Sequence, residues 1–395
     1  MGKKPPSVNN LALSLQNSGI PHELLVEQAR SAIAAGDWEN MEERVEHLQR
    51  SFIQPVINAT GVLLHTNLGR ASWKSPESNF SSNIEFDLAS GNRGSRQTGI
   101  GNLFAQLCGA ESAMVVNNCS SAVLLVLSAL ASGKGVAISR SELVEIGGSF
   151  RVPEILELSG ANLVEVGTTN KTRLADYQKA IDAHRDVAMS LKVHQSNYKI
   201  VGFTEEATVE EITSLDLPLV VDIGSGLLDS SCPWLSSGPP KWLVGEPAAK
   251  QTLLGGADLV TFSCDKLLGG PQAGIVAGKS DLIEKCLRHP FARVLRPGSH
   301  TLLSLQELAM RYLHRDGDGI PFWKMASLGL EELRIRAERV NAGEIVSVDS
   351  IPGGGTLPTV VIPSIGLKFS GDRSSELRRG FNGGLPIIAR VSDGD

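Results

Sequence analysis

The sequence predicts an α/β protein built on a mainly parallel β-sheet, with a small helical extension before it and a smaller α+β domain after it. From about residue 58 to residue 324, short apolar runs alternate with stretches of helix length. These runs are apolar throughout, as strands of a parallel sheet are when helices cover both of its faces. The strand candidates are residues 113–117, 135–139, 163–167, 218–223, 258–263 and 273–278.

The 395 residues are enough for more than one hydrophobic core, and changes of pattern divide them. We predict a helical extension at 1–54, a catalytic α/β domain at 55–325 and a small α+β domain at 326–395. The extension begins with a polar stretch and continues with helical periodicity that Gly19 and Gly36 interrupt. In the last domain we expect a helix at 328–341 and strands at 345–349 and 358–363.

The composition is that of an ordinary soluble globular protein, with 42% hydrophobic and 20% charged residues. No apolar run approaches the roughly 18–20 residues that span a bilayer, and no apolar segment follows the basic start. We therefore expect a cytoplasmic protein that does not enter a membrane. The five cysteines are widely spaced without a CxxC pair, which favours reduced thiols over a disulfide framework or a metal site.

Lys266 carries the strongest chemical signal in the sequence. It follows the apolar run 258–263, and the chain then turns through Gly269 and Gly270 into another strand. A lysine at a strand end beside a glycine-rich turn can enter a cleft where nothing bulky blocks a flat ring. Schiff-base chemistry needs such an amine, partly desolvated so that its pKa falls. The alternative is an ordinary surface lysine beside a β-turn.

Asp222 supports a cofactor that is bound to Lys266 as an imine. It stands at the end of the buried strand predicted at 218–223. A carboxylate there can keep a pyridine nitrogen protonated, which makes the ring an electron sink. A structural aspartate that caps the following loop is the alternative.

A predicted helix start offers a site for the phosphate of such a cofactor. Cys119, Ser120 and Ser121 begin an apolar helix. Exposed N–H groups and hydroxyls at this position suit a phosphate dianion. Simple N-capping explains the same residues equally well.

Another strand end places His194 among the expected cofactor-binding residues, with Ser196 and Asn197 close behind it. Ligand groups collect at such strand ends in open α/β sheets, although a packed histidine is the alternative. Ser263, which ends the strand before Lys266, joins the same set. The order of phosphate-binding helix, strand-end aspartate and strand-end lysine resembles that of fold-type-I pyridoxal-phosphate enzymes. This resemblance implies pyridoxal 5′-phosphate as the cofactor.

Longer motifs resemble one family within that class, the bacterial selenocysteine synthases, or L-seryl-tRNA(Sec) selenium transferases. INATGVLLHTNLGRA (57–71) and SNIEFDLASGNRGSR (82–96) are the most specific of these motifs. Together with the others they cover nearly the whole chain from Pro55 onward, in the order found in the family. The others are residues 141–155, 165–177, the segment around Lys266, 288–298, GGGTLPTVVIP (353–363) and LPIIARVSDGD (385–395).

The resemblance implies the conversion of L-seryl-tRNA(Sec) to L-selenocysteinyl-tRNA(Sec) with selenophosphate. The serine amine would displace Lys266 from the cofactor, and the freed lysine would remove the α-proton. Loss of the hydroxyl would then give an aminoacrylyl intermediate, to which selenium adds. Lys266 would finally release the product.

Arginines suit the highly charged selenophosphate, because their planar guanidinium groups match phosphate oxygens and stay charged. By the resemblance, Arg70, Arg293 and Arg296 fall where the family places its anion-binding arginines. Arg93 and Arg96 are further candidates, for the anion, for the cofactor phosphate or for a neighbouring subunit. For each arginine alone, a surface salt bridge is the alternative.

The family implies two kinds of macromolecular partner. Its members bind tRNA through a helical N-terminal domain and form homo-oligomers, rings of dimers with active sites at subunit interfaces. Residues 11–50 resemble that domain loosely, but they are short and more acidic than basic, so a packing extension is the alternative. The net charge of −6 argues against general nucleic-acid coating and leaves room for local recognition of one RNA. The family continues beyond VSDGD, so we expect a truncated C-terminal domain with an exposed sheet edge.

Two other interpretations remain open. A related fold-type-I lyase that acts on a small phosphorylated amino compound would keep Lys266 and Asp222 and could use the same arginines. A catalytically silent RNA-binding or assembly protein would have a decayed cofactor site, and the intact segment around Lys266 argues against it.

Overall fold

The computed structural model describes residues 4–74, 81–146, 150–380 and 384–392. Parts of the polar start, of the 141–155 motif and of the last motif lie outside these ranges. The chain folds as two compact units. One comprises residues 1–57 and 375–388, and the other comprises residues 58–374 and 389–395.

The first unit is mainly helical and has a small core of its own. Leu25, Ala29 and Val45 are buried in this core, on the apolar faces of amphipathic helices. Gly19 and Gly36 interrupt the helices as predicted, and both adopt positive φ angles. Its helices are α1 (Val8–Leu13), α2 (His22–Ala34), α3 (Met41–Ser51) and most of α15 (Ser374–Arg379). The strands β1 (Ile57–Ala59) and β14 (Ile387–Ala389) pair with each other, and each lies only partly in this unit.

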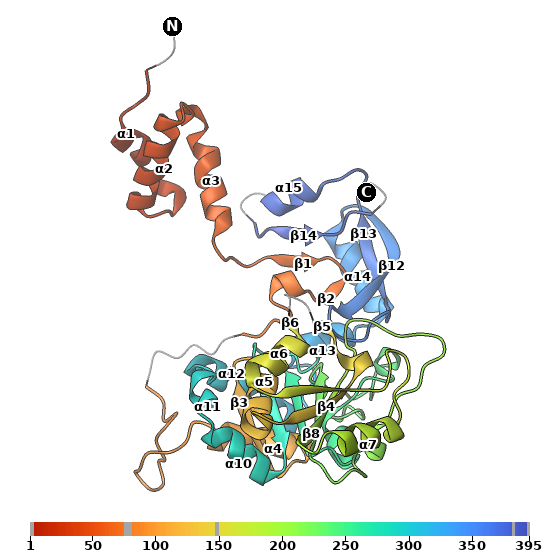
Figure 1. The fold of residues 1–395 in the computed structure, drawn as a ribbon. Helices are drawn as coiled ribbons and strands as arrows, with labels where there is room; N and C mark the ends of the chain where they lie inside the picture. Colours follow the sequence, from red (N-terminus) through yellow and green to blue (C-terminus); the bar gives the residue numbers. More distant parts are fainter. Residues whose placement is uncertain (1–3, 75–80, 147–149, 381–383, 393–395) are drawn as a thin grey trace. The chain divides into compact units, whose positions relative to one another are not determined.

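A seven-stranded sheet forms the centre of the second unit (Figure 1). All its strands run parallel except β11, which is antiparallel to both of its neighbours. The predicted mainly parallel sheet is therefore confirmed. In spatial order the strands are β3 (Ser112–Val116), β11 (Gly274–Gly278), β10 (Leu259–Ser263), β9 (Leu219–Gly224), β8 (Val187–Val193), β4 (Gly135–Ser139) and β7 (Asn162–Val166).

The strand β8 is not among the strand candidates of the sequence, because Lys192 interrupts its apolar run, but it ends directly before His194, where the sequence predicts a strand end. The structure explains how the sheet tolerates this charge. The Lys192 ammonium donates to the buried carboxylate of Glu142 at 3.1 Å and to the carbonyl of Ala207 at 3.1 Å. Since both partners lie far from Lys192 in sequence, local patterning could not reveal them.

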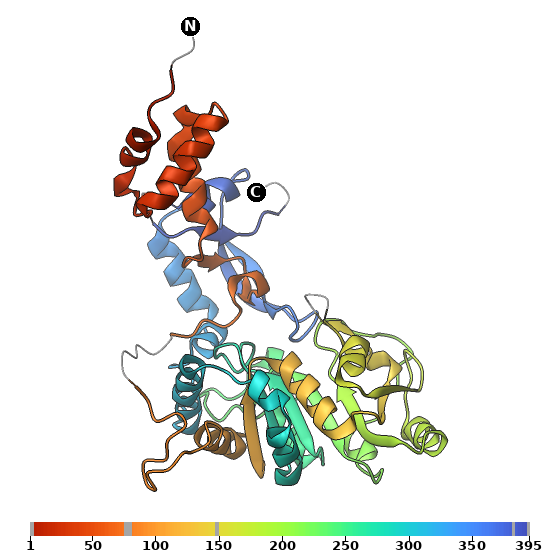
Figure 2. The ribbon, with the colours of Figure 1, turned by 60° about the vertical axis from the view of Figure 1, so that its left-hand side comes forward.

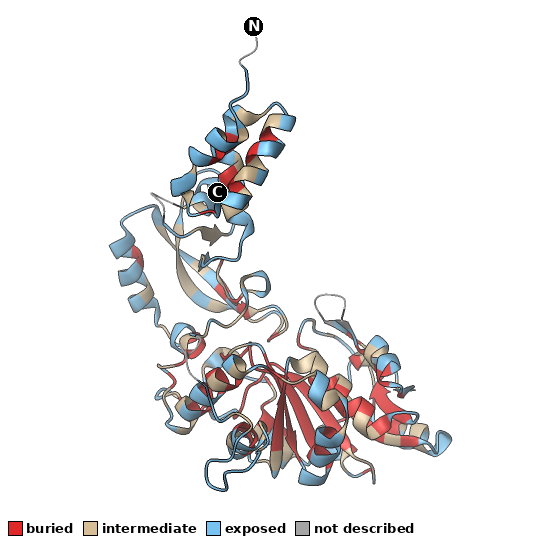
Figure 3. Cartoon of the chain, turned by 90° about the vertical axis from the view of Figure 1, so that its left-hand side faces the viewer, coloured by how far each residue is buried: buried red, intermediate tan, exposed pale blue. Residues whose placement is uncertain are grey.

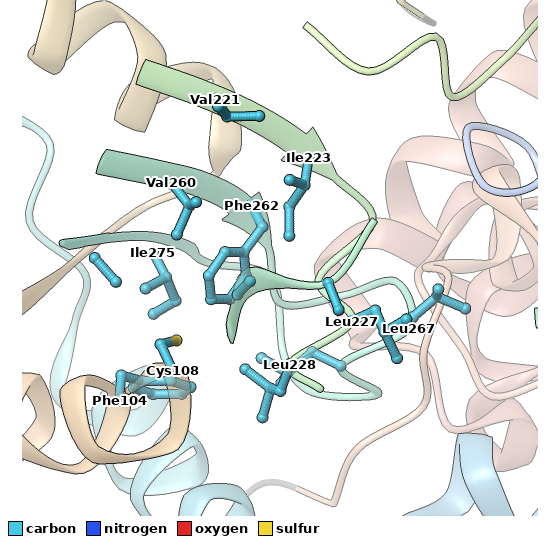
Figure 4. Close-up of a cluster of buried hydrophobic side chains, with 14 of the residues drawn as sticks. Phe104, Cys108, Val221, Ile223, Leu227, Leu228, Val260, Phe262, Leu267 and Ile275 are labelled. Atoms are coloured by element: carbon cyan, nitrogen blue, oxygen red, sulfur yellow. The ribbon is translucent and has the colours of Figure 1, made fainter. Parts of the chain in front are cut away.

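Alternate strand side chains enter two cores, one on each face of the sheet. Val221, Phe262 and Phe104 belong to the core on one face (Figure 4), whereas Val220 and Val276 belong to the core on the other. The strands are buried almost throughout (Figure 3), and α5 and α10 lie side by side on one face (Figure 2). The first face is covered by α4 (Thr98–Cys108), α7 (Leu174–Ala183), α9 (Ala249–Leu254) and α12 (Ser299–Leu313), and the second by α5 (Cys119–Ala131), α6 (Val152–Ser159) and α10 (Ser280–Arg288).

A smaller three-stranded sheet follows the order β13 (Ile362–Lys368), β12 (Glu344–Gly353) and β2 (Val62–Leu64), with α14 (Leu330–Val340) packed against it. The strand predicted at 358–363 is wrong over most of its length. Leu357 and Thr359 have φ angles of 47° and 72°, which an extended strand excludes, so β13 begins only at Ile362.

The remaining short elements connect these layers. Within the described ranges, no helix has the length and apolar character needed to cross a lipid bilayer. The short elements are β5 (Glu145–Ile146), β6 (Phe150–Arg151), α8 (Val209–Ile212), α11 (Phe291–Val294) and α13 (Pro321–Ala326).

Candidate active site

The predicted site residues gather at the carboxyl edge of the parallel strands. The strands β3, β8, β9 and β10 all end at this edge, at residues 116, 193, 224 and 263. Ligands of open α/β sheets bind outside such an edge, because there the loops that follow several strands meet.

Lys266 is almost fully buried, with 4% of its surface exposed. Its Nζ donates a hydrogen bond to the carbonyl oxygen of Gly355 at 3.0 Å. Burial lowers the pKa of this amine, and the positive charge of Arg70 lowers it further, while Asp222 and Asp265 oppose the change. The predicted desolvated amine is therefore present in the structure.

Asp222, in β9, is equally buried. Its Oδ1 accepts hydrogen bonds from the amide of Gly224 at 3.0 Å and from the thiol of Cys119 at 3.2 Å. Burial raises the pKa of Asp222, since a lone charge there is poorly solvated, and Lys266 opposes this effect. Burial also raises the pKa of Cys119 well above its usual range, so its thiol stays protonated and donates. The carboxylate is held in one orientation and would gain from a further cation beside it.

The helix α5 begins at Cys119, as the sequence predicts. The Asn118 side chain caps it by accepting a hydrogen bond from the amide of Ser121 at 2.8 Å. Its first turn also includes Ser120. A Cβ added to Gly274, the first residue of β11, would lie 2.2 Å from the carbonyl oxygen of Asn118, so glycine is required for this close approach. The positive end of the helix thus lies at the same sheet edge and favours an anion.

His194 follows β8, and its amide donates to the carbonyl of Asp222 at 2.9 Å. Its Nε2 lies 3.6 Å from a carboxylate oxygen of Glu246. Among the described residues, neither Nε2 nor either carboxylate oxygen of Glu246 has a hydrogen-bond partner, although all three atoms are buried. Sequence reasoning missed Glu246, which stands in a loop without a motif. The pair leaves polar atoms beside the site that a bound ligand could satisfy.

Ser196 lies near Lys266, whereas Asn197 does not join it. A Cβ added to Gly224 would lie 3.8 Å from both Lys266 Nζ and Ser196 Oγ. Asn197 instead donates from its side-chain amide to the carbonyl of Glu145 at 2.8 Å. Ser196 therefore belongs to the site, and Asn197 anchors a loop.

Ser263 ends β10 and is buried. Its carbonyl oxygen approaches Gly226 so closely that a Cβ there would lie 2.2 Å away. The amide of Leu267 donates to the carbonyl of Ser225 at 2.8 Å. These backbone contacts fix the turn that carries Lys266 against the loop that follows β9.

Arg70 is held close to Lys266 by its contacts with Asp265. The Nη1 of Arg70 lies 3.1 Å from Oδ2 of Asp265, which directly precedes Lys266. The amide of Ala71 also donates to the carbonyl of Asp265 at 3.1 Å. We call the residues assembled here the lysine cluster, namely Arg70, Cys119, Ser196, Asp222, Asp265 and Lys266.

Three of the other arginines converge on a single carboxylate. Arg96, Arg93 and Arg296 lie 2.8, 3.1 and 3.1 Å from the oxygens of Glu85. Hydrogen bonds from Arg96 and then Arg93 hold the pKa of Glu85 below its usual range. Arg293 is exposed on α11. We call Glu85 with its three arginine partners the Glu85 cluster.

Backbone contacts attach the segments of the Glu85 cluster to the end of β3. The carbonyl of Leu295 accepts a hydrogen bond from the amide of Asn117 at 2.9 Å, directly before α5. The side chain of Gln97 bonds the backbone of Val115 in both directions, at 2.8 and 2.9 Å. Four of the predicted arginines are therefore divided between two groups, both connected to the carboxyl edge, and Arg293 belongs to neither group.

The profile of the L-seryl-tRNA selenium transferase family matches residues 56–395. The chain belongs to this family. The L-seryl-tRNA(Sec) selenium transferase of Moorella thermoacetica is 41% identical over 384 residues, which cover 89% of this chain and 79% of that protein. That of Aquifex aeolicus is 42% identical over 381 residues, covering 91% and 82%. That of Clostridium perfringens is 39% identical over 415 residues, covering 98% and 86%.

Among solved structures, a D-glucosaminate-6-phosphate ammonia-lyase matches with a TM-score of 0.58 and 18% identity, covering 85% of this chain and 87% of that one. At this identity the likeness shows the fold alone. The predicted fold class and the predicted membership of the selenium transferase family are both confirmed.

The selenium transferases are pyridoxal-phosphate enzymes, and the residues of this site fit that cofactor. The fit consists of a buried lysine amine, a buried carboxylate that needs a cation, and a helix start that favours an anion. Gly224 lies beside them, since an added Cβ there would be at ordinary contact distance, 3.8 Å, from both Lys266 and Ser196. Each part of the cofactor has a chemically matched partner on this edge of the sheet.

Proposed function

We propose that the chain converts L-seryl-tRNA(Sec) to L-selenocysteinyl-tRNA(Sec), with selenophosphate as the selenium donor. The observation that carries the proposal is the burial of both Lys266 and Asp222 at the carboxyl edge, in a chain about 40% identical to curated L-seryl-tRNA(Sec) selenium transferases. The fold-type-I lyase considered above would use the same lysine, so the choice of substrate rests on family membership.

When bound, pyridoxal phosphate supplies an electron sink beside the α-carbon of the serine. Lys266 would hold the cofactor between turnovers and, once freed, would accept the α-proton on Nζ. Burial lowers the pKa of this amine, so a larger fraction of it is neutral and able to accept the proton. Asp222 would keep the ring nitrogen protonated, and that cation would stabilise the buried carboxylate in return.

Other residues would hold the negative charges. The start of α5, with Cys119, Ser120 and Ser121, would bind the cofactor phosphate through backbone N–H groups and hydroxyls. Arg70, which lies beside Lys266, would bind selenophosphate together with two arginines of the 288–298 segment, Arg293 and Arg296. His194 and Ser263 would complete the cofactor site.

The wider organisation is also part of the proposal. We assign residues 1–54 to tRNA binding, residues 55–325 to catalysis and residues 326–395 to a small C-terminal domain. A homo-oligomer with sites at subunit interfaces would bring further arginines to each site. The substrate, a charged tRNA, places the reaction in the cytoplasm.

The direct test is conversion of seryl-tRNA(Sec) by the purified full chain with selenophosphate, measured as selenium attached to tRNA. We expect the wild-type protein to show the visible absorbance band of lysine-bound pyridoxal phosphate. Lys266→Ala should lose both the band and the activity, because no other residue of the lysine cluster carries an amine. Seryl-tRNA(Ser) serves as the control substrate and should react poorly.

An unchanged band in Lys266→Ala would refute the cofactor assignment. Equal binding and conversion of the two tRNAs would refute the substrate assignment and favour the small-molecule lyase. The two parts of the proposal can thus fail separately.

A further inference from the structure

The amine of Lys266 is held by backbone from the loop after β12, far from it in sequence. Its hydrogen bond to the Gly355 carbonyl, at 3.0 Å, joins the turn after β10 to this loop. Lys266 is buried, so water cannot readily replace this acceptor. The small three-stranded sheet therefore contributes directly to the surroundings of the reactive amine.

Glycine suits this approach in two ways, through its backbone conformation and through its lack of a side chain. Its φ angle is +81°, a conformation that L residues rarely adopt. An added Cβ would lie 3.3 Å from Nζ and 3.7 Å from Cε of Lys266, and 4.0 Å from Oγ of Ser196. A side chain at this position would compete with Lys266 for its place.

The loop is fixed on both sides of Gly355. Before it, Gly353 pairs with Leu64 of β2, and a Cβ there would lie 2.6 Å from the Leu64 side chain. After it, Thr356 is buried and donates its hydroxyl to the Gly353 carbonyl at 3.5 Å, and Leu357 is buried in the main core. The carbonyl of Gly355 is thus a preorganised acceptor.

We propose that Gly355 is a positioning residue, whose carbonyl holds the amine of Lys266 whenever that amine is not bonded to the cofactor. This inference rests on the proposed function, in which Lys266 is freed and then acts as the base. A neutral amine donates one N–H to the carbonyl and keeps its lone pair for the α-proton. When Nζ accepts that proton, the electron pair of the broken C–H bond would be taken up by the bound cofactor, and the carbonyl dipole of Gly355 would stabilise the positive charge that develops on Nζ.

The test compares Gly355→Ala with Gly354→Ala in the holoenzyme. A Cβ on Gly354 would meet Thr66 Oγ1 at 3.2 Å and not the lysine, which makes it a matched control. We expect Gly355→Ala to keep its cofactor band but to slow exchange of the serine α-hydrogen with solvent deuterium roughly 100-fold, the cost of a small misplacement of a catalytic group. The KM for seryl-tRNA should not change. Gly354→Ala should exchange close to the wild-type rate.

Thr356→Val provides a second variant, because it removes the hydroxyl that ties the loop without adding bulk near Lys266. It should slow the same exchange step by a smaller factor, with its thermal unfolding recorded beside that of the other variants. Wild-type exchange in both Gly355→Ala and Thr356→Val would overturn the inference, as would equal slowing in Gly355→Ala and Gly354→Ala. If Gly355→Ala does not fold, Thr356→Val decides alone. A wild-type protein without a Lys266-dependent band would instead refute the proposed function itself.

Discussion

The lysine cluster and the Glu85 cluster lie at the same sheet edge but hold their charges in different surroundings. Lys266 and Asp222 are each 4% exposed, and burial shifts the pKa of both. In the Glu85 cluster the side chains of Arg296 and Arg93 are 34% and 76% exposed. The charges of the lysine cluster are fixed in the protein interior, where the low dielectric strengthens the interactions between them. Water partly screens the interactions between the charges of the Glu85 cluster.

This difference has a consequence for chemistry. When a buried charge loses its partner, no water is present to replace that partner. Substitutions in the lysine cluster should therefore reduce activity strongly. Exposed ion pairs are worth little by themselves, so changes in the Glu85 cluster should matter only where an arginine also binds a ligand. The variants below test that contrast.

The largest effect is expected for Asp222→Asn. The amide has nearly the shape of the carboxylate but cannot hold a protonated ring nitrogen by charge. We expect kcat to fall roughly 10²–10³-fold, as when one preorganised electrostatic partner is removed, while Lys266 keeps the cofactor bound. Steady-state kinetics and the absorbance band measure the two properties.

Asp281→Asn, on the exposed face of α10, is the matched control and should leave both properties unchanged. An Asp222→Asn enzyme with wild-type kcat would show that the buried carboxylate has no part in the reaction.

Arg296→Ala should have the next largest effect. If Arg296 binds selenophosphate, the loss of a charge-assisted hydrogen bond should raise the KM for selenophosphate roughly 10-fold or more. Arg93 shares the same carboxylate partner but is far more exposed, so Arg93→Ala should change this KM about fivefold or less. Similar KM values for the two variants would mean that Arg296 has no special part in binding selenophosphate and that the Glu85 cluster only holds surface arginines in place.

Glu246→Gln tests a buried carboxylate beside the site that the sequence did not predict. The carboxylate lies 3.6 Å from His194 Nε2, and its oxygens have no hydrogen-bond partner within the described residues. If Glu246 orients His194 against the cofactor, the amide should raise the rate of cofactor release about 10-fold, measured by absorbance after dilution. Glu331→Gln, on exposed α14, is the control. An unchanged release rate would make the pair structural only.

The contrast also explains what the sequence could predict. Lys266, Asp222 and Cys119 were predictable because each follows or ends an apolar strand, and parallel strands bring their ends together. Gly355 and Glu246 were not, because each acts through one contact with a residue far away in sequence. The strand order and the pairing of β2 with β12 are long-range for the same reason.

The positions of the arginines could also be predicted only in part from the sequence. Family motifs gave five candidate arginines, but only the structure separates Arg70, beside Lys266, from the three that meet Glu85. Loop residues such as Leu357 and Thr359 escaped prediction because positive φ angles for these residue types are set by packing and not by local preference.

The smallest effect concerns the stability of the cofactor-free protein. Burial lowers the pKa of Lys266 below its ordinary value of 10.5, so the folded protein carries a penalty for the charged amine. Between the two pKa values the unfolded chain binds more protons, so the free energy of unfolding rises with pH there. Lys266→Met should therefore be more stable than wild type at neutral pH, by about 1.4 kcal/mol for each pKa unit.

That advantage should shrink as the pH rises from the folded pKa towards 10.5, in urea unfolding measured over a pH series. Lys279 supplies a control of opposite sign. It is exposed and lies 2.6 Å from Asp258, and this hydrogen bond raises its pKa. Lys279 therefore stabilises the fold at neutral pH and loses this effect as the pH rises through its folded pKa, so Lys279→Met should be less stable than wild type at neutral pH. Equal pH dependence in the two variants would show that the amine of Lys266 is not desolvated, and that the contrast between a buried and an exposed charge does not hold for these two lysines.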